Sequence, residues 1–348
     1  MEEWEAEVDP ETRALLTRYG FDAHTFEGLR ARLRSGDADD ESNRLTVPLA
    51  SPREEDLALL PARGTIAHER LNTQGIAVLR AGQVAVVILA GGMATRFGGV
   101  VKAAVPVLGD DTFLTLKLRD LAQVARSTGT RLTSLLMTSF ATHSTIDAMA
   151  RAACTEQLQV ETFPQLVSLR LQPSGALFHE RDGRASPYAP GHGDFSFALR
   201  RADLPARLRS AGVRYLFVSN VDNLAATLDP ALIAMHVARD AEISFEVVPL
   251  AAGDKGGVPA RLDGRLQIIE ALRYPAGFDE RSIPWFSINS FVVNLAAVDR
   301  DFDLSWFRVT KQVDGAPVVQ FERLVNQLSA HLHACAVAVA REGVEGRF

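Results

Sequence analysis

VAVVILAGGMATRFGGVVKAAVP, residues Val84 to Pro106, is the most informative stretch of this sequence. It begins with an apolar, β-branched run, Val84 to Leu89, which is typical of a buried strand. A glycine-rich segment follows, in which Arg96 and Lys102 carry the positive charges. Glycines let backbone N–H groups approach an anion closely, and the two cations can bind phosphate oxygens. The stretch therefore predicts a phosphate-binding loop after the first strand of an α/β sheet.

The glycine pattern excludes the two commonest nucleotide-binding loops. It lacks the G-x-x-x-x-G-K-[ST] spacing of a P-loop, and it does not fit G-x-G-x-x-G, which disfavours a dinucleotide-binding fold. What remains is the pattern L-A-G-G-x-x-T-R-F-G, residues 89–98. The loop therefore indicates a different class of phosphate-binding protein.

The bulk composition excludes several further classes. The chain has 348 residues, 47% of them hydrophobic, which suits two domains or one large α/β domain with an appendage. Its 37 basic and 43 acidic residues give a net charge of −6, which disfavours nucleic-acid and anionic-membrane partners. No apolar run reaches the length of a membrane span, and the acidic first residues lack the features of a signal peptide. We therefore expect a cytoplasmic protein in which Cys154 and Cys335 are buried thiols, with a disulfide or a reactive thiol as the less favoured alternative. The oligomeric state stays open.

The pattern of apolar residues changes at about residue 80. Residues 1–80 are predicted to form an N-terminal helical appendage, with one helix expected over 52–60. In residues 81–348 strands alternate with helices, which implies right-handed βαβ units and a mostly parallel sheet. Such sheets bind ligands beyond the carboxyl ends of their strands. Further along, we expect a hairpin around Asp263-Gly264 and a helix over 319–332.

Four more motifs follow the glycine loop. They are Met137-Thr138-Ser139-Phe140, Thr162-Phe163-Pro164-Gln165, Tyr188-Ala189-Pro190-Gly191-His192-Gly193-Asp194 and Phe217-Val218-Ser219-Asn220-Val221-Asp222-Asn223. In this order and spacing, together with the loop, they resemble the UTP–glucose-1-phosphate uridylyltransferase (UDP-glucose pyrophosphorylase) family over roughly Val84 to Phe348. The resemblance implies that residues 81–348 are a nucleotidyltransferase catalytic domain. It implies a Rossmann-like, glycosyltransferase-A-type core, with a mixed, mostly parallel sheet flanked by helices.

The resemblance also implies a reaction. Glucose-1-phosphate would attack the α-phosphorus of UTP, with Mg²⁺ as cofactor, to give UDP-glucose and pyrophosphate. Positioning the substrates and neutralising their crowded phosphates would be the main catalytic tasks. No covalent nucleophile is expected, because Ser139 and Ser219 lack a nucleophile-elbow context.

Two cations of the glycine loop are the catalytic candidates. Lys102, flanked by apolar residues just after the loop, would contact the α- and β-phosphates, and a solvated surface lysine is the alternative. Arg96 matches the T-R of the wider nucleotidyltransferase pattern, and a loop salt bridge is its alternative. Many relatives have G-P-K where this chain has V-V-K-A-A, so we expect the lysine to be displaced by one position.

The resemblance implies that residues at the ends of several strands bind the nucleotide. Gln165 matches the glutamine with which the family reads uracil, and its amide offers a donor and an acceptor to the O4/N3–H edge. A polar cap on a strand end is the alternative. The other residues expected to contact the nucleotide are Leu89, Ala90, Gly91, Gly92, Gly191 and Asn220.

Other loops are expected to bind the sugar phosphate and the metal. His192 stands between two glycines, and the resemblance assigns it to the sugar phosphate. Asp222 follows a buried strand and is a natural magnesium ligand near a triphosphate, with a turn cap as the alternative. The residues that fall where relatives contact the sugar hydroxyls are Lys255, Gly257, Glu270 and Asn289. Here Asn289-Ser290 replaces an Asn-Asn pair common in relatives, so the sugar contacts are expected to differ.

The chain also departs from the family at its end. In the family that this chain resembles, the sequence continues past a Gly/Arg-Phe stretch into Pro-Val-Lys, whose lysine joins the site. This sequence stops at Gly346-Arg347-Phe348, after an apolar strand expected over 334–340. We therefore expect a chain cut short before a segment that closes over the phosphates. The form without that segment is expected to be open and of low activity unless Arg96 or Lys255 replaces the missing lysine.

Two other functions stay open. One is the same chemistry on another sugar-1-phosphate, such as N-acetylglucosamine-1-phosphate, although the G-H-G-D loop favours glucose. The other is a non-catalytic UTP or UDP-sugar binding protein, which the missing lysine supports.

Overall fold

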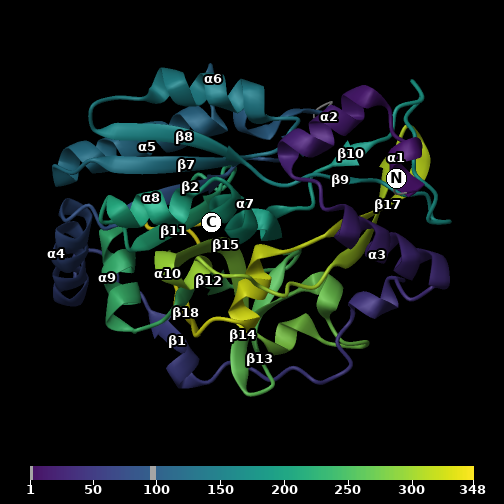
Figure 1. The fold of residues 1–348 in the computed structure, drawn as a ribbon. Coiled ribbons are helices and arrows are strands. Elements are labelled where there is room, and N and C mark those ends of the chain that lie inside the picture. The colour runs from purple at the N-terminus through teal and green to yellow at the C-terminus, as the bar shows by residue number, and fades with distance from the viewer. Residues whose placement is uncertain (1–2, 95–98) are drawn as a thin grey trace.

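The structure is a computed structural model that describes residues 3–94 and 99–348. At its centre lies an eight-stranded sheet (Figure 1). In sheet order, the strands are β1 (Leu57–Leu59), β18 (Ala334–Ala338), β12 (Ile243–Pro249), β15 (Trp285–Asn294), β11 (Tyr215–Asn220), β2 (Val84–Leu89), β7 (Leu132–Thr138) and β8 (Leu158–Pro164). Neighbouring strands are parallel except at β15, which runs antiparallel to both β11 and β12. The expected mixed, mostly parallel sheet is confirmed.

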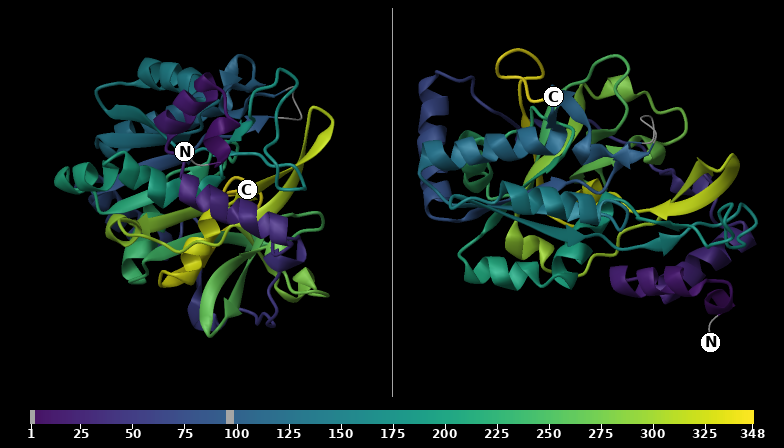
Figure 2. Two further views of the ribbon diagram at one scale, coloured as in Figure 1. Left: turned by 45° about the vertical axis from the view of Figure 1, so that its right-hand side comes forward. Right: turned by 90° about the horizontal axis from the view of Figure 1, so that it is seen from above.

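Helices cover both faces of this sheet (Figures 1 and 2). The helices on one face are α4 (Ile66–Arg80), α5 (Phe113–Thr128), α6 (His143–Ala153) and α9 (Pro230–Ala238). The helices on the other face are α7 (Phe195–Arg201), α8 (Leu204–Ser210) and α10 (Leu295–Val298). In β2, Val86 and Ile88 join the first core, whereas Val87 and Leu89 join the second. Every residue of β2 is buried, which explains why this strand is an unbroken apolar run.

The N-terminal helices pack elsewhere, beside β17 at the right of Figure 1. These helices are α1 (Glu3–Ala6), α2 (Pro10–Tyr19) and α3 (Ala23–Ser35). Leu16 of α2 and Phe26 of α3 share a core with Val319 and Phe321 of β17. The expectation of helices at the start of the chain is therefore confirmed for α2 and α3.

The helix expected over 52–60 is wrong. A short 3-10 helix, η2 (Glu54–Asp56), leads into β1, in which Leu57 pairs with Ala336 of β18. The error arises because the pairing partner lies at the other end of the chain, where local periodicity carries no information about it. Since α4 packs against α9, both β1 and α4 belong to the layers of the main sheet.

Two hairpins extend from the main sheet. β13 (Gly257–Leu262) and β14 (Arg265–Glu270) are joined at Asp263-Gly264, whose φ angles of 52° and 76° fit the predicted tight turn. β16 (Phe307–Val313) and β17 (Ala316–Glu322) form the second hairpin, which reaches outward in Figure 2. The helix expected over 319–332 is therefore wrong, because its first residues lie in β17 and only the 3-10 helix η8 (Val325–Ala330) follows.

Three short strand pairs complete the fold. They are β3 (Met93–Ala94) with β4 (Val100–Val101), β5 (Pro106–Leu108) with β6 (Asp111–Thr112), and β9 (Ser168–Leu169) with β10 (Pro187–Tyr188). Both cysteines are free thiols, but only Cys335 is buried, so the expected burial of Cys154 is wrong. No helix within residues 3–94 and 99–348 is long and apolar enough to cross a membrane.

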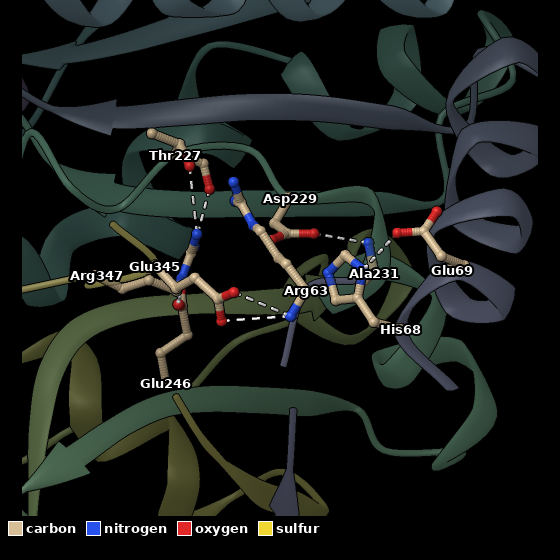
Figure 3. Close-up of polar contacts among 9 residues, drawn as sticks. All are labelled: Arg63, His68, Glu69, Thr227, Asp229, Ala231, Glu246, Glu345 and Arg347. Atoms are coloured by element: carbon tan, nitrogen blue, oxygen red, sulfur yellow. Dashed lines mark hydrogen bonds and ion pairs between the residues drawn. The ribbon is translucent and has the colours of Figure 1, made fainter. Parts of the chain in front are cut away.

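After β18 the chain folds back and ends in a buried ion pair (Figure 3). The Arg347 guanidinium binds the carboxylate of Glu246 on β12, and the two side chains are 4% and 0% exposed. Arg347 Nη2 also donates to the carbonyl oxygen of Thr227 at 2.8 Å. Arg347 therefore ties β12 to the loop that joins β11 to α9.

Candidate active site

A cleft of about 770 Å³ lies where β2, β7, β8 and β11 end. Asn220 pairs with Leu89 and Leu89 pairs with Met137, so the last part of three neighbouring strands borders the cleft side by side. Ala90 is buried just behind it, and its N–H donates to the Met137 carbonyl at 2.8 Å. Parallel sheets bind their ligands at this edge. The cleft is therefore the candidate active site.

The glycine loop forms one wall of the cleft. Gly91 and Gly92 follow β2 and line the cleft, and the short strands β3 and β4 bring the chain back beside them. The N–H of Lys102 then donates to the Gly92 carbonyl at 3.1 Å, which places this lysine at the cleft as well. Arg96, the other predicted cation, lies outside the described residues.

Lys102 forms an ion pair with Asp222, with 2.5 Å between Nζ and Oδ2. The two side chains are 39% and 37% exposed. Solvent-exposed ion pairs contribute only about 0–1 kcal/mol. Either partner can therefore exchange the other for a ligand, and the Asp222 carboxylate could then hold a cation.

Gln165 packs against the glycine loop. Its backbone N–H donates to the Thr138 carbonyl at 2.8 Å, and the residue is buried. A Cβ added to Gly91 would lie 2.2 Å from Gln165 Nε2, so any side chain there would displace the amide. Within the described residues, the buried Oε1 of Gln165 has no hydrogen-bond partner. Since a buried acceptor without a donor is costly, Gln165 is ready to receive an N–H group from a ligand.

The turn Gly191–Gly193 packs flat against the residue that follows β17. Gly193 N–H donates to the Arg323 carbonyl oxygen at 2.9 Å, and an added Cβ would lie 2.3 Å from the carbonyl carbon. Gly191 lines the cleft with a φ of 100°, a conformation that favours glycine. Both glycines are therefore needed to bring the residue between them to the cleft.

That residue, His192, is oriented by its Nδ1. This atom accepts a hydrogen bond from the backbone N–H of Val325 at 2.9 Å, which leaves Nε2 as the donor. Burial lowers the pKa of His192, although the nearby carboxylates of Glu270 and Glu322 act in the opposite direction. His192 is therefore a neutral hydrogen-bond donor at the cleft and not a cation.

Asp194 and Arg323 link this turn to Gln165. Arg323 Nε donates to Asp194 Oδ1 at 3.0 Å, and Oδ2 of the same carboxylate accepts from the N–H of Leu166 at 3.1 Å. The guanidinium also lies over two aromatic rings, 4.1 Å and 4.2 Å from their centroids. Asp194 belongs to a predicted motif, but Arg323 belongs to none, so the sequence analysis missed this positioning pair.

Asn289 meets Asn220 across a bulge in β15. The register of β12 with β15 shifts around Asn289, whose φ is 55°, a left-handed value that Asn tolerates. Asn289 Nδ2 donates to Asn220 Oδ1 at 2.9 Å. The structure thus brings together these two predicted site residues, and the bulge explains how.

The residues predicted for the sugar hydroxyls, Asn289 included, are not among those that line this cleft. Gly257 pairs with Glu270 across the β13–β14 hairpin. Glu270 Oε1 accepts from Asn326 Nδ2 at 2.6 Å. Lys255 precedes β13 and is exposed.

The β16–β17 hairpin adds a wall that no motif predicted. Lys311, Gln320 and Glu322 line the cleft from its two strands, next to Arg170. Gln320 Nε2 donates to Glu322 Oε1 at 2.6 Å, and Lys311 Nζ lies 3.5 Å from the same oxygen. Period-two alternation over β17 is the sequence signal for these side chains, and the helix predicted over 319–332 overlooks it.

Most of the chain resembles known proteins in sequence. A family model described as UTP–glucose-1-phosphate uridylyltransferase matches residues 50–345. The chain is 31% identical to the UTP–glucose-1-phosphate uridylyltransferase of Musa acuminata, over 69% of this chain and 55% of that protein. It is 29% identical to UTP–glucose-1-phosphate uridylyltransferase 2 of Dictyostelium discoideum, over 70% of this chain and 51% of that protein. The chain thus spans about half the length of the curated relatives it matches.

Solved structures share the fold. One is a uridine diphosphate N-acetylglucosamine pyrophosphorylase from Trypanosoma brucei in complex with an inhibitor. Its TM-score is 0.73 at 21% identity, covering 97% of this chain and 76% of that one. Another is a UDP-glucose phosphorylase from Trypanosoma brucei, with a TM-score of 0.72 at 25% identity and coverage of 91% and 70%.

Proposed function

Because this chain belongs to the UTP–glucose-1-phosphate uridylyltransferase family, we propose that its cleft transfers uridylyl from UTP to glucose-1-phosphate and releases pyrophosphate. One observation carries the proposal: the glycine loop, an amide with an unpaired oxygen and an exchangeable lysine–aspartate ion pair border a single cleft. A phosphate chain, a nucleobase and a metal ion are the groups that these three features can bind.

Gln165 would read the base. Its unpaired Oε1 can accept from uracil N3–H while Nε2 donates to O4, so both atoms of the amide gain partners. Leu89 and Gly91 would lie under the base and ribose, with backbone groups of the glycine loop adding contacts. Gly191 and Asn220 would border the rest of the nucleotide.

Lys102 would neutralise the α- and β-phosphates. In the absence of substrate it pairs with Asp222, an exposed pair that a phosphate group can replace at small cost. A cation fixed where charge accumulates in the transition state lowers the barrier without further reorganisation.

Asp222 would hold Mg²⁺ through its second oxygen. Within the described residues, no group of three or more His, Cys, Asp or Glu side chains could hold a metal ion, so the protein itself offers few ligands. That fits Mg²⁺, which often binds one or two carboxylates and takes its other ligands from water and substrate phosphates. When bound, the ion would supply further positive charge to the phosphates.

His192 would donate Nε2–H to the phosphate of the sugar and so aim the attacking oxygen. That oxygen forms the new bond to the α-phosphorus as the bond to the bridging oxygen breaks, and pyrophosphate leaves. The attacking phosphate is already ionised, so no side chain has to remove a proton, and orientation is the main task. Glu270 and Asn289 would meet the sugar hydroxyls, with Gly257 and Lys255 on the same side.

The test is turnover by the purified chain. UTP and glucose-1-phosphate with Mg²⁺ should yield pyrophosphate, and a panel that includes N-acetylglucosamine-1-phosphate identifies the preferred sugar. UTP should be preferred to ATP and dTTP if Gln165 reads the base. UTP binding without release of pyrophosphate from UTP, whichever sugar phosphate is added, would refute the enzymatic function and favour a binding protein.

A further inference from the structure

We propose that Lys311, on the β16–β17 hairpin, is a second phosphate-binding cation of this cleft and takes the β- and γ-phosphates of UTP, the part that leaves as pyrophosphate. The inference rests on the proposed function. It adds a second cation to Lys102, from a hairpin that lies much later in the chain.

The register of the hairpin fixes the direction of Lys311. Directly paired residues project to the same face, and Lys311 pairs with Val318 two positions before Gln320 on β17. Lys311, Gln320 and Glu322 therefore share one face, and all three line the cleft. The opposite face carries Phe321, which is buried in the core of the N-terminal helices. The hairpin cannot turn Lys311 away from the cleft without exposing that core.

Of the lysines and arginines that line the cleft among the described residues, Lys311 has the weakest contacts with protein groups. Its ion-pair partner is Glu322 at 3.5 Å, and half of its side chain is exposed. Arg170, by contrast, donates to Ser186 Oγ at 2.9 Å and to the Pro187 carbonyl at 2.8 Å. It also donates to Gln320 at 3.2 Å, so its guanidinium is engaged by protein groups.

Glu322, the ion-pair partner of Lys311, would keep a hydrogen bond when Lys311 binds a phosphate. Glu322 Oε1 already accepts from Gln320 Nε2 at 2.6 Å, a bond that remains if Lys311 moves to a phosphate oxygen. The lysine would exchange one long contact with a carboxylate for charge-assisted hydrogen bonds to a phosphate. A triphosphate and a sugar phosphate bring more negative charge than Lys102 and one Mg²⁺ ion together offset, so a further cation has a clear role.

The hairpin is held at both ends. Near its base, Tyr188 Oη donates to the Phe321 carbonyl at 2.9 Å and accepts from the Phe321 N–H at 2.8 Å. At its tip, Asp314 Oδ2 accepts from the N–H of Arg181 at 3.2 Å. Lys311 lies between these anchors, so its backbone is fixed while its side chain can move.

Binding titrations test the inference directly, with UTP, pyrophosphate and uridine as probes. Lys311→Met should weaken UTP and pyrophosphate binding by about tenfold or more, the scale of losing one electrostatic contact. It should leave uridine binding unchanged, because uridine has no phosphate. Lys311→Arg should retain most of the affinity for UTP.

Arg131→Met is the matched control, because it also removes one positive charge but from an exposed pair at the start of β7, away from the carboxyl ends of the strands. It should bind all three probes as the wild-type chain does. Equal UTP affinity in Lys311→Met and wild type would overturn the inference, and so would an equal loss for UTP and uridine. A wild-type chain that binds UTP but turns over no sugar phosphate would refute the proposed function and leave the binding result intact.

Discussion

The Lys102–Asp222 pair and the Arg347–Glu246 pair both act on the loop between β11 and α9, but in opposite environments. Asp222 begins this loop, and its pair with Lys102 is 37–39% exposed. Thr227 lies further along the same loop and is held by Arg347, whose pair with Glu246 is at most 4% exposed (Figure 3). One pair is open to exchange with ligands, and the other is closed to solvent.

The contrast shows how side chains at a site can change partners while the backbone that carries them stays fixed. An exposed pair contributes little to stability, so its partners can be traded for substrate groups. A buried pair gives up its hydration, so removing one partner leaves an uncompensated charge in the core. We infer that Arg347 holds the loop from behind so that Asp222, at its front, can change partners without moving the backbone.

The largest expected effect comes from breaking the buried pair. Arg347→Met should lower the free energy of unfolding by about 3–5 kcal/mol, because Glu246 would remain buried without a cation. Denaturant unfolding measures this. Adding Glu246→Gln should recover part of the loss. Arg209→Met, which breaks a surface pair with Asp299, is the control and should cost about 0–1 kcal/mol. Equal losses in the two single variants would remove the distinction between buried and exposed pairs.

Breaking the exposed pair should have the converse effect. Lys102→Ala should reduce turnover of UTP and glucose-1-phosphate by about two orders of magnitude, the scale of losing one preorganised electrostatic contact. Its stability should stay within about 0.5 kcal/mol of wild type, as for surface substitutions. Steady-state kinetics and unfolding of the same preparation test both statements. Near wild-type turnover would exclude Lys102 from a catalytic role.

The carboxylate of the exposed pair should affect the metal requirement. Asp222→Asn keeps the size of the side chain but removes its charge, so half-maximal activity should need about tenfold or more Mg²⁺. Chelation should abolish the activity of the wild-type chain, and added Mg²⁺ should restore it. An unchanged Mg²⁺ requirement in Asp222→Asn would exclude this residue as the metal ligand.

The sequence could predict that the segments at the front of this cleft come together, because the signals for them are local. The apolar run Val84–Leu89 is buried on both faces of the sheet, and the segments after it end at one edge by the rule for parallel strands. Gln165 and His192 could be proposed from short motifs. Gly191 and Gly193 flank His192, and Gly91, in the glycine loop, packs against Gln165. The partners of their side chains could not be predicted from these motifs.

What the sequence analysis missed depends on contacts between distant segments. Leu57 lies in a strand because of Ala336, and Lys311 faces the cleft because of its register with β17. Arg323 supports Gln165 through Asp194, a link that no local pattern encodes. Helical spacing over a short apolar stretch cannot be told from a buried strand until the pairing partner is known.

A third cation extends the comparison, since Lys117 is as buried as Arg347 but lacks its carboxylate. Its Nζ donates to Ser219 Oγ and to the Ala226 carbonyl, both at 2.8 Å, and so braces the same loop. Within the described residues it has no ion-pair partner. Burial therefore lowers the pKa of Lys117 to about 7, although the charges of Asp120 and Glu246 oppose the shift.

The smallest expected effect follows from this pKa. In the unfolded chain lysine keeps its proton up to about pH 10.4, whereas folded Lys117 releases it above about pH 7. Between these values the unfolded state binds more protons, so the free energy of unfolding rises with pH, and below pH 7 both states are protonated and the slope vanishes. From pH 7 to pH 8 the wild-type chain should gain about 1 kcal/mol relative to Lys117→Met. Denaturant unfolding at the two pH values measures the difference. Lys255→Met, which replaces an exposed lysine, is the control and should show the same change in the free energy of unfolding between the two pH values as wild type. If Lys117→Met shows the same pH dependence as wild type, Lys117 keeps its proton in the folded state and pairs more strongly than its contacts indicate.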